Sequence, residues 1–267
     1  MSKRAGKYES TIEEIRVSDL EVDPSYQTGL NVGWIKKTAP HFDRKEIRII
    51  TVSIRADGKR IIVDGQHRVA LMIELGLQAE LIRCEVFKGL SVAEEAHKFL
   101  ILNNNRSKRP LDRYRAALVA GEPEAVGIDR ILRKLGLKAS DQNGAGYVRG
   151  IAHIQRIYRG ARIANAAQGA HALETTLTIM RDAWGMDHKN FKSAIIEGLG
   201  LILLRFKTKV DVKVMVEKLT SVAPSKILQG AVALKEVRHK SESHVVAEVI
   251  VTIYNKNRRA RKLPEWK

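Results

Sequence analysis

The first hundred residues alternate between short β-branched apolar runs and polar turns, a pattern typical of a mixed sheet. Four runs predict strands, at residues 11–20, 47–55, 60–64 and 80–87. The turn "ADGKR" between the second and third runs carries the Asp57-Gly58 signal, so we expect these two strands to form a hairpin. Residues 23–31 begin with an Asp-Pro bond and predict a loop, and Pro40 ends the short helix predicted after it.

Helical spacing follows the third and fourth predicted strands. Residues 69–76, "VALMIELG", predict a helix that its final glycine terminates. Ser91 and Glu94 have the spacing of a capping box, in which each side chain binds the other residue's backbone N–H. The helix that they begin has an apolar face and runs out in "NNNR", residues 103–106, because asparagine favours turns and caps over helix interiors.

Strand signals stop after residue 108, and Pro110 can occupy the first turn of the next helix. Further helices are predicted at residues 124–135, 147–158, 172–184, 190–206, 212–219, 225–237 and 243–255. The chain is therefore expected to be α+β, with a small mixed-sheet domain at residues 10–108 and an all-helical domain at residues 109–267. Residues 140–146, "SDQNGAG", are a second candidate hinge.

The chain contains 47 Lys and Arg residues against 30 Asp and Glu residues, a formal net charge of +17. Such an excess favours an anionic partner, above all nucleic acid, although a basic surface without such a partner is the alternative. No apolar run is long enough for a membrane span, so we expect no membrane partner. Cys84 is the only cysteine, so no internal disulfide can form, which fits a reducing cytoplasm. Its predicted strand favours a buried apolar role.

The segment "VDGQHR", residues 63–68, brings an acid, a glycine, an amide, an imidazole and a guanidinium to one strand-to-helix corner. A helix start directs unpaired N–H groups outward, and glycine permits a tight turn with room for a ligand. Arg68 offers a fork of donors that fits phosphate, and His67 can donate a hydrogen bond or move a proton. Asp64 can bind a metal or simply cap the helix, and the whole set can also be an ordinary turn with a solvated helix face.

This corner, placed between a hairpin and a helix, resembles the signature of the ParB/sulfiredoxin superfamily, in the Asp-Gly-Gln-His-Arg form of the ParB-like N-terminal "nuclease" domain. "VDPSYQ", residues 22–27, resembles the upstream Pro/Gln motif of ParB N-terminal domains, and "NNNR" resembles their downstream Asn/Arg box. The three motifs occur in the family's order, which is more specific than any one of them alone. The helical part resembles ParB-like proteins of phages and actinobacteria, which implies the cytoplasm of a bacterium or of a phage-infected host.

The resemblance implies several activities. ParB proteins bind and hydrolyse CTP and clamp onto DNA, some relatives are nucleases, and others are kinases of free serine. Sulfiredoxins use ATP and a catalytic cysteine at the corner, but Gln66 stands where that cysteine would be, which argues against their chemistry. Partitioning ParB proteins carry Gly-Glu-Arg-Arg at the corner. Because this chain lacks that Glu, the bound nucleoside triphosphate is left open between CTP and ATP, with Mg²⁺ as a possible cofactor.

The resemblance also implies that the three motifs converge on one nucleotide pocket. Its binding residues would be Gln27, Gly65, Gln66, His67, Arg68, Asn103, Asn104 and Arg106. The candidate catalytic residues would be Asp64, His67 and Asp23, with Asp64 also the candidate metal ligand and Asp23 the base of a kinase. Without the family pattern, "NNNR" is read more simply as a frayed helix end, and "PSYQT" as a loop held by its Pro and Tyr residues.

The helical domain carries the expected nucleic-acid contacts. These are Arg133, Lys134, Arg149, Arg156, Arg258, Arg259 and Arg261. Residues 126–163 could form a helix-turn-helix, but their polar loop is longer than the usual tight turn, which favours a general helical bundle. The basic cluster "NKNRRARK", residues 255–262, is either a phosphate-contacting segment, which we prefer, or a mobile solvated tail. Trp34, Trp184 and Trp266 are expected to be packing residues, with no stacking platform for single strands.

The sequence thus predicts a ParB-like DNA-binding protein with a nucleoside-triphosphate pocket at the corner. Hydrolysis of the nucleotide and formation of a homodimer are left open. The alternatives are a metal-dependent DNA nuclease, a small-molecule kinase of the serine type, and a non-catalytic DNA-binding or phage–host interaction protein.

Overall fold

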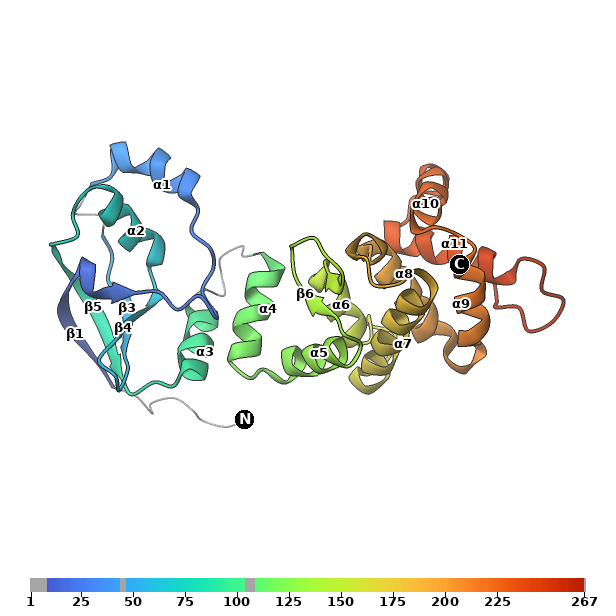
Figure 1. Cartoon of the computed structure of the whole chain (residues 1–267), viewed down its shortest axis with the longest axis horizontal. Helices are drawn as coiled ribbons and strands as arrows, with labels where there is room; N and C mark the ends of the chain where they lie inside the picture. Colours follow the sequence, from blue (N-terminus) through green and yellow to red (C-terminus); the bar gives the residue numbers. More distant parts are fainter. Residues whose placement is uncertain (1–8, 44–46, 104–108, 267) are drawn as a thin grey trace. The chain divides into compact units, whose positions relative to one another are not determined.

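The computed structural model describes residues 9–43, 47–103 and 109–266. Internal contacts divide the chain into two compact units, residues 1–122 and 123–267. The first unit contains the main sheet and the predicted corner, and the second is predominantly helical (Figure 1). Both units bury large apolar side chains of their own, as expected of domains with separate cores.

A five-stranded sheet with the order β1-β5-β3-β4-β2 forms the centre of the first unit. Its strands are β1 (Ser10–Arg16), β2 (Leu20–Glu21), β3 (Ile50–Ile54), β4 (Arg60–Asp64) and β5 (Leu81–Lys88). β3 pairs antiparallel with β4 and parallel with β5, β1 pairs antiparallel with β5, and β2 pairs parallel with the start of β4. The strand predicted at residues 11–20 is divided, because a 3₁₀ turn at Val17–Asp19 separates β1 from β2.

Local sequence signals are realised where they were predicted. The β3–β4 hairpin is present: Gly58 has a φ of 83°, and the backbone N–H of Lys59 donates to Asp57 Oδ1 at 3.1 Å. The capping box is also confirmed, because the N–H of Glu94 donates to Ser91 Oγ while the Glu94 carboxylate accepts from the N–H of Ser91. Short-range chemistry therefore sets these turn and helix boundaries.

Helix α2 (Gln66–Glu74) covers one face of the sheet. Met72 from this helix packs with Ile62 of β4 and Cys84 of β5 in a cluster of buried apolar side chains. Cys84 is buried, as predicted, and burial raises the pKa of its thiol to about 11. The thiol is therefore protonated at neutral pH and serves in packing.

Helix α3 (Val92–Leu102) covers the opposite face, and helix α4 (Pro110–Val119) packs against α3. Val63 points to this face, because successive residues of a strand alternate between the two sides of a sheet. Phe99 of α3 and Ala116 of α4 join Val63 in one buried cluster. Helix α4 therefore belongs by its contacts to the first unit, although the predicted domain boundary lies before it.

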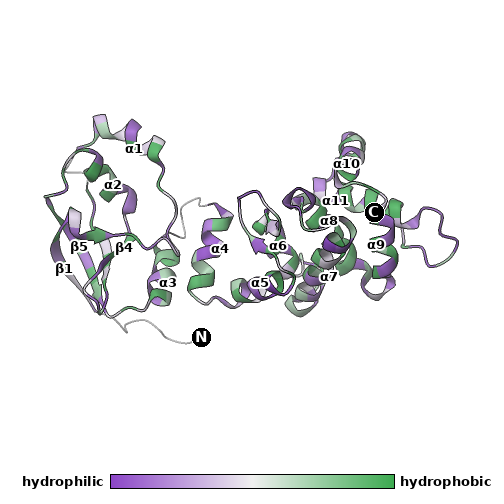
Figure 2. Ribbon diagram, viewed as in Figure 1, coloured by the Kyte–Doolittle hydropathy of each residue, from purple (hydrophilic) through white to green (hydrophobic). Residues whose placement is uncertain are grey.

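The second unit is a bundle of α5 (Pro123–Lys134), α6 (Ile151–Tyr158), α7 (Ala166–Trp184), α8 (Ser193–Phe206), α9 (Val212–Thr220), α10 (Pro224–Arg238) and α11 (Glu242–Asn255). Helix α8 is strongly apolar (Figure 2). Nearly all of its side chains are buried. Helices α6, α7 and α11 pack against it. In the part of the chain that the structure describes, no helix has the length and apolar character needed to span a bilayer.

The predicted helix at residues 147–158 starts later than expected. Tyr147–Val148 forms strand β7, which pairs parallel with β6 (Lys138–Ala139), so a two-stranded sheet is added to the predicted helical fold. Gly150 follows with a φ of 77°, and α6 begins only after it. Because this sheet separates α5 from α6, the connection is longer than a helix-turn-helix turn, as the sequence indicated.

Candidate functional site

The corner between β4 and α2 depends on a glycine. Gly65 has a φ of 107° and lies between the last residue of β4, Asp64, and the first residue of α2, Gln66. A Cβ atom at Gly65 would lie 2.6 Å from Ile50 Cδ1 and 2.9 Å from Arg68 Nη2. Backbone conformation and close packing therefore both require glycine at this position.

Arg68 ties the corner to the residues that precede β3. Its Nη1 donates to the carbonyl oxygens of Arg48 and Ile49, at 2.8 and 3.0 Å. Its Nη2 donates to Asp64 Oδ2 at 3.0 Å, and both partners of this ion pair are about four-fifths buried. The guanidinium and the carboxylate thus hold each other, and the N-cap position of α2 belongs to Gly65 rather than Asp64.

Two glutamine amides hold the loop at residues 22–31 against the corner. Nε2 of Gln66, a buried residue, donates to the carbonyl and hydroxyl oxygens of Thr28, at 2.7 and 2.9 Å. Nε2 of Gln27 donates to the carbonyl oxygens of Ile62 and Val63, at 2.8 and 2.9 Å. Strand β2 pairs only with the start of β4, so its ladder does not reach Ile62 or Val63. The two amides supply hydrogen bonds to the carbonyl oxygens of these two residues and of Thr28.

His67 joins the corner to helix α1 (Val32–Thr38). Its Nε2 lies 3.0 Å from the backbone nitrogen of Asn31, the N-cap residue of α1. A backbone N–H can only donate, so this geometry assigns Nε2 as an acceptor and the imidazole hydrogen to Nδ1. The Trp34 ring lies edge to face with the imidazole, with ring centroids 6.0 Å apart.

A cavity of about 840 Å³ opens beside these groups, entirely within the first unit. The corner itself, Asp64 to Arg68, forms one wall. The rest of the lining comes from residues 27–32 and 34 on the loop and α1, from Phe99 and Asn103 on α3, and from Arg109 and Asp112 at the start of α4. Cavities of this size accommodate a nucleotide-sized molecule.

The structure brings together most of the residues expected from the three motifs. Gln27, Gly65, Gln66, His67, Arg68, Asp64 and Asn103 all line the cavity, and Asn103 is buried with its Nδ2 donating to the carbonyl of Phe99 at 2.9 Å. Asn104 and Arg106 lie outside the described residues.

The cavity also contains residues that the sequence did not single out. Trp34 was expected to pack but is 43% exposed at the cavity wall. Arg109 places a largely exposed guanidinium there and donates to Asp112 Oδ2 at 3.2 Å. No local motif marks either residue, because their roles depend on how α1 and α4 pack beside the corner.

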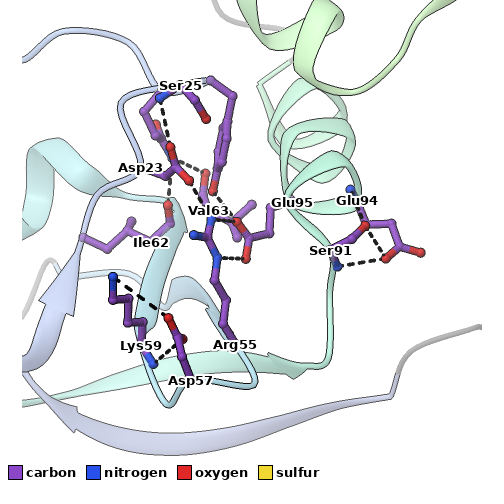
Figure 3. A network of polar contacts seen from close by, with 12 residues as sticks. Asp23, Ser25, Arg55, Asp57, Lys59, Ile62, Val63, Ser91, Glu94 and Glu95 are labelled. Atoms are coloured by element: carbon purple, nitrogen blue, oxygen red, sulfur yellow. Dashed lines mark hydrogen bonds and ion pairs between the residues drawn. The ribbon is translucent and has the colours of Figure 1, made fainter.

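Asp23, the predicted kinase base, is engaged elsewhere and is not among the residues that line the cavity. Its Oδ1 accepts from the N–H of Ser25 at 2.9 Å and its Oδ2 accepts from Arg55 Nη2 at 2.7 Å (Figure 3). Burial alone would raise the pKa of Asp23, but these hydrogen bonds outweigh it and the pKa is lowered overall. A carboxylate held this way is a weak base with a structural role.

Arg55 binds a second, fully buried carboxylate in the same network. Its Nε donates to Glu95 Oε1 at 2.9 Å, its Nη2 contacts Glu95 Oε2, and Tyr26 OH donates to Oε2 at 3.2 Å. The hydrogen bond to Glu95 raises the pKa of Arg55, and burial followed by the Glu95 charge raises the pKa of Tyr26. The network fixes the loop that carries Gln27 to β3 and α3.

The predicted nucleic-acid residues of α5, α6 and the loop between them have partners within the second unit. Arg133 pairs with Asp129 and Lys134 with Glu174. Arg149 Nη2 donates to the carbonyl oxygen of Asp141 at 2.8 Å and to Asn143 Oδ1 at 2.6 Å, and Arg156 pairs with the buried Glu197 at 2.6 Å. All four remain exposed, so their charges face solvent although they are paired.

The C-terminal basic cluster forms a loop whose two ends are joined by hydrogen bonds. Asn255 closes it, because its Oδ1 accepts from the N–H of Leu263 and its Nδ2 donates to the carbonyl of Leu263, both at 2.8 Å. Leu263 and Trp266 are buried, and Trp266 lies edge to face with Phe206. The residues between the two ends, 256–262, carry five cations and no acid.

Among the described residues, no three His, Cys, Asp or Glu side chains come together as a ligand set for a metal ion. Asp64 and Asp112 are the carboxylates at the cavity wall. Mg²⁺ in nucleotide sites is commonly held by one or two carboxylates together with phosphate oxygens, and this donor set fits that arrangement.

Comparison with known proteins gives a family without an assigned role. No curated protein matches the chain. Among solved structures, the chain is similar to the C-terminally truncated chromosome-partitioning protein ParB from Caulobacter crescentus, complexed with CTP-γ-S. The sequence identity is 14% and the TM-score is 0.31, and the match covers 73% of this chain and 97% of that one. A Pnob8-like ParB-N domain is similar at 10% identity and a TM-score of 0.42, covering 91% and 94%. The family of unknown function DUF6551 matches residues 23–266, and the chain therefore belongs to that family.

Proposed function

We propose that the first unit binds a nucleoside triphosphate in the cavity at the β4–α2 corner. The observation that carries this proposal is the convergence on one cavity of Gln27, the Asp64–Arg68 corner and Asn103, which come from three separate motifs. The sequence resemblance to ParB N-terminal domains concerns the same three motifs. CTP and ATP are the nucleotides that this resemblance implies.

The polar residues of the cavity support phosphate binding, but the roles of the two arginines differ from those expected from the sequence. The first turn of α2 offers backbone N–H groups and the positive end of a helix dipole, which favour an anion. Arg109, with its largely exposed side chain, is the cavity cation suited to reach a phosphate. Arg68 acts as a positioning residue, because its donors bind Asp64 and two carbonyl oxygens.

Mg²⁺ would be held by the phosphates together with Asp64 or Asp112, and it would neutralise phosphate charge there. His67 fits a positioning role, since its Nε2 accepts from the backbone of Asn31. The kinase alternative loses its candidate base, because Asp23 is bound to Arg55 in a separate network. Nucleotide hydrolysis is the extension of this proposal that requires a water molecule oriented by one of the two cavity carboxylates.

Calorimetric titration of the full chain with each of the four nucleoside triphosphates, with and without Mg²⁺, tests the proposal. Arg109→Ala should weaken binding by roughly tenfold or more, because a charge-assisted contact to phosphate is lost. Arg115→Ala is the matched control, since Arg115 is exposed on the same helix but does not line the cavity. Absence of binding by the wild-type chain would overturn the proposal.

We propose further that the helical unit contacts DNA phosphates through the loop at residues 256–262. The loop is closed by Asn255 and Leu263, so its cations are held together despite their mutual repulsion. Asn257 and Arg261 have positive φ values of 61° and 53°, a strained conformation that persists only when its surroundings fix it. A preorganised cationic loop loses little conformational entropy when it binds a polyanion.

Fluorescence anisotropy with a labelled duplex, measured over a range of salt concentrations, tests the DNA proposal. The double substitution Arg259→Ala/Arg261→Ala should weaken binding on all sequences and lower the salt slope by about two, one for each phosphate contact. Lys213→Ala/Lys226→Ala removes the same charge from exposed sites elsewhere in the unit. Equal effects of the two pairs would show that net charge rather than the loop governs binding.

A further inference from the structure

Three apolar side chains are exposed on the wall of the cavity contributed by the loop and α1. Leu30 is 48% exposed, Val32 is 55% exposed and Trp34 is 43% exposed, and all three line the cavity. Single exposed apolar residues are ordinary on a protein surface, but a group that includes tryptophan within one concave site is typical of a ligand contact. This wall has no counterpart in the three sequence motifs.

The wall is held in place from behind. The side chain of Asn31 caps α1 by accepting from the N–H of Trp34 at 3.0 Å, and Ile35 is buried beneath the helix. The N–H of Asn31 donates to His67 of α2, which packs beside α1 (Figure 1). Trp34 meets the His67 ring at an interplanar angle of 82°. This contact orients the indole and leaves much of its surface open to solvent.

The two walls differ in chemistry and face one volume. The corner and the start of α4 contribute two acids, the amide of Gln66 and the cations Arg68 and Arg109, whereas residues 30, 32 and 34 contribute apolar surface. The ligand class that matches both is a planar aromatic ring joined to an anionic group. Aromatic side chains bind such rings by stacking, because every nucleobase presents a π-face.

We propose that Trp34 stacks on the base of the bound nucleotide, with Leu30 and Val32 flanking it, while the phosphates lie toward α2 and α4. This inference rests on the proposed function, since it names the part of the nucleotide that the apolar wall contacts. Stacking is tolerant of base identity, so Trp34 contributes affinity for every nucleotide that binds.

The test compares a nucleoside triphosphate with inorganic tripolyphosphate, which lacks the base. Trp34→Ala in the full chain should weaken nucleotide binding by roughly 5- to 150-fold, the range expected for loss of one stacked base, while affinity for tripolyphosphate is unchanged. Trp34→Phe should retain part of the nucleotide affinity. Ile73→Ala is the control, because Ile73 is exposed on α2 without lining the cavity.

The outcomes separate this inference from the proposal on which it rests. If the wild-type chain binds neither ligand, the proposed function fails together with it. If nucleotide binds equally to wild type and Trp34→Ala, the nucleotide site stands and the stacking role is overturned. Equal losses for nucleotide and tripolyphosphate would also overturn it, because Trp34 would then be holding the site's shape. If Trp34→Ala changes the oligomeric state in size-exclusion chromatography but leaves the affinities for both ligands unchanged, the stacking role is overturned as well.

Discussion

Nε2 of His67 accepts a hydrogen bond from the backbone N–H of Asn31 at 3.0 Å, and this contact joins the first turn of α2 to the start of α1. The motif histidine thereby positions the apolar wall beside the polar corner. This contact connects the corner, which the sequence motifs indicated, with the apolar wall, which they did not.

Replacement of His67 should distinguish a positioning role from a proton-transfer role. His67→Ala removes the acceptor for Asn31 and should weaken nucleotide binding by roughly 2- to 10-fold, the worth of one such hydrogen bond. His67→Gln keeps an acceptor oxygen near the Nε2 position and should retain most of the affinity. If Gln is as damaging as Ala in calorimetry, the imidazole itself is required and the positioning role is wrong.

Gly65→Ala should destabilise the first unit more than the same change in the β3–β4 turn. A Cβ at residue 65 meets Ile50 Cδ1 at 2.6 Å, so the cost is backbone strain plus a packing clash, about 2–4 kcal/mol in urea unfolding. Gly58→Ala is matched, because Gly58 also has a positive φ but no atom within 4 Å of its would-be Cβ. It should cost only about 1 kcal/mol. Similar losses for both would contradict the close packing at the corner.

Arg55→Met should be strongly destabilising because it leaves Glu95 charged and fully buried beside Tyr26. Breaking one side of such a pair typically costs about 3–5 kcal/mol of unfolding free energy. Arg60→Met serves as the comparison, since Arg60 and its partner Asp19 are each more than two-fifths exposed, and it should cost less than about 1 kcal/mol. Chemical denaturation of both variants measures the difference.

The lowered pKa of Asp23 predicts a specific pH dependence. A carboxylate whose folded pKa lies below its ordinary value of 3.8 stabilises the fold above that pH and loses the contribution as pH falls through the folded pKa. The stability difference between wild type and Asp23→Asn should therefore be largest near neutral pH, at about 1–2 kcal/mol, and should shrink below about pH 4. A difference that stays constant across the titration would show that the charge of Asp23 is not responsible.

Local signals made much of the fold predictable. The Asp57-Gly58 turn and the Ser91/Glu94 capping box act through contacts a few residues apart, so their sequence patterns carry the structure directly. The strand break at residues 17–19 was missed, because the alternation there is irregular and the 3₁₀ turn is set by pairing with two different neighbours.

The candidate site was predictable only in outline. The motifs indicated which residues meet. They did not indicate that the amides of Gln27 and Gln66 bind backbone oxygens, or that Arg68 donates to Asp64 within the corner. Trp34 was interpreted as a packing residue, because its local sequence does not indicate whether the indole is buried or exposed. The closure of the C-terminal loop was equally hidden, since Asn255 reaches its partner only in the folded chain.

Occupation of the corner cavity by a nucleotide is the central proposal, and the stacking role of Trp34 depends on it. Hydrogen–deuterium exchange of the full chain, with and without saturating nucleoside triphosphate and Mg²⁺, tests it by location. We expect slower exchange at residues 28–34 and 65–68, where the two walls meet the ligand. Unchanged exchange in both segments, or protection confined to the helical unit, would contradict it.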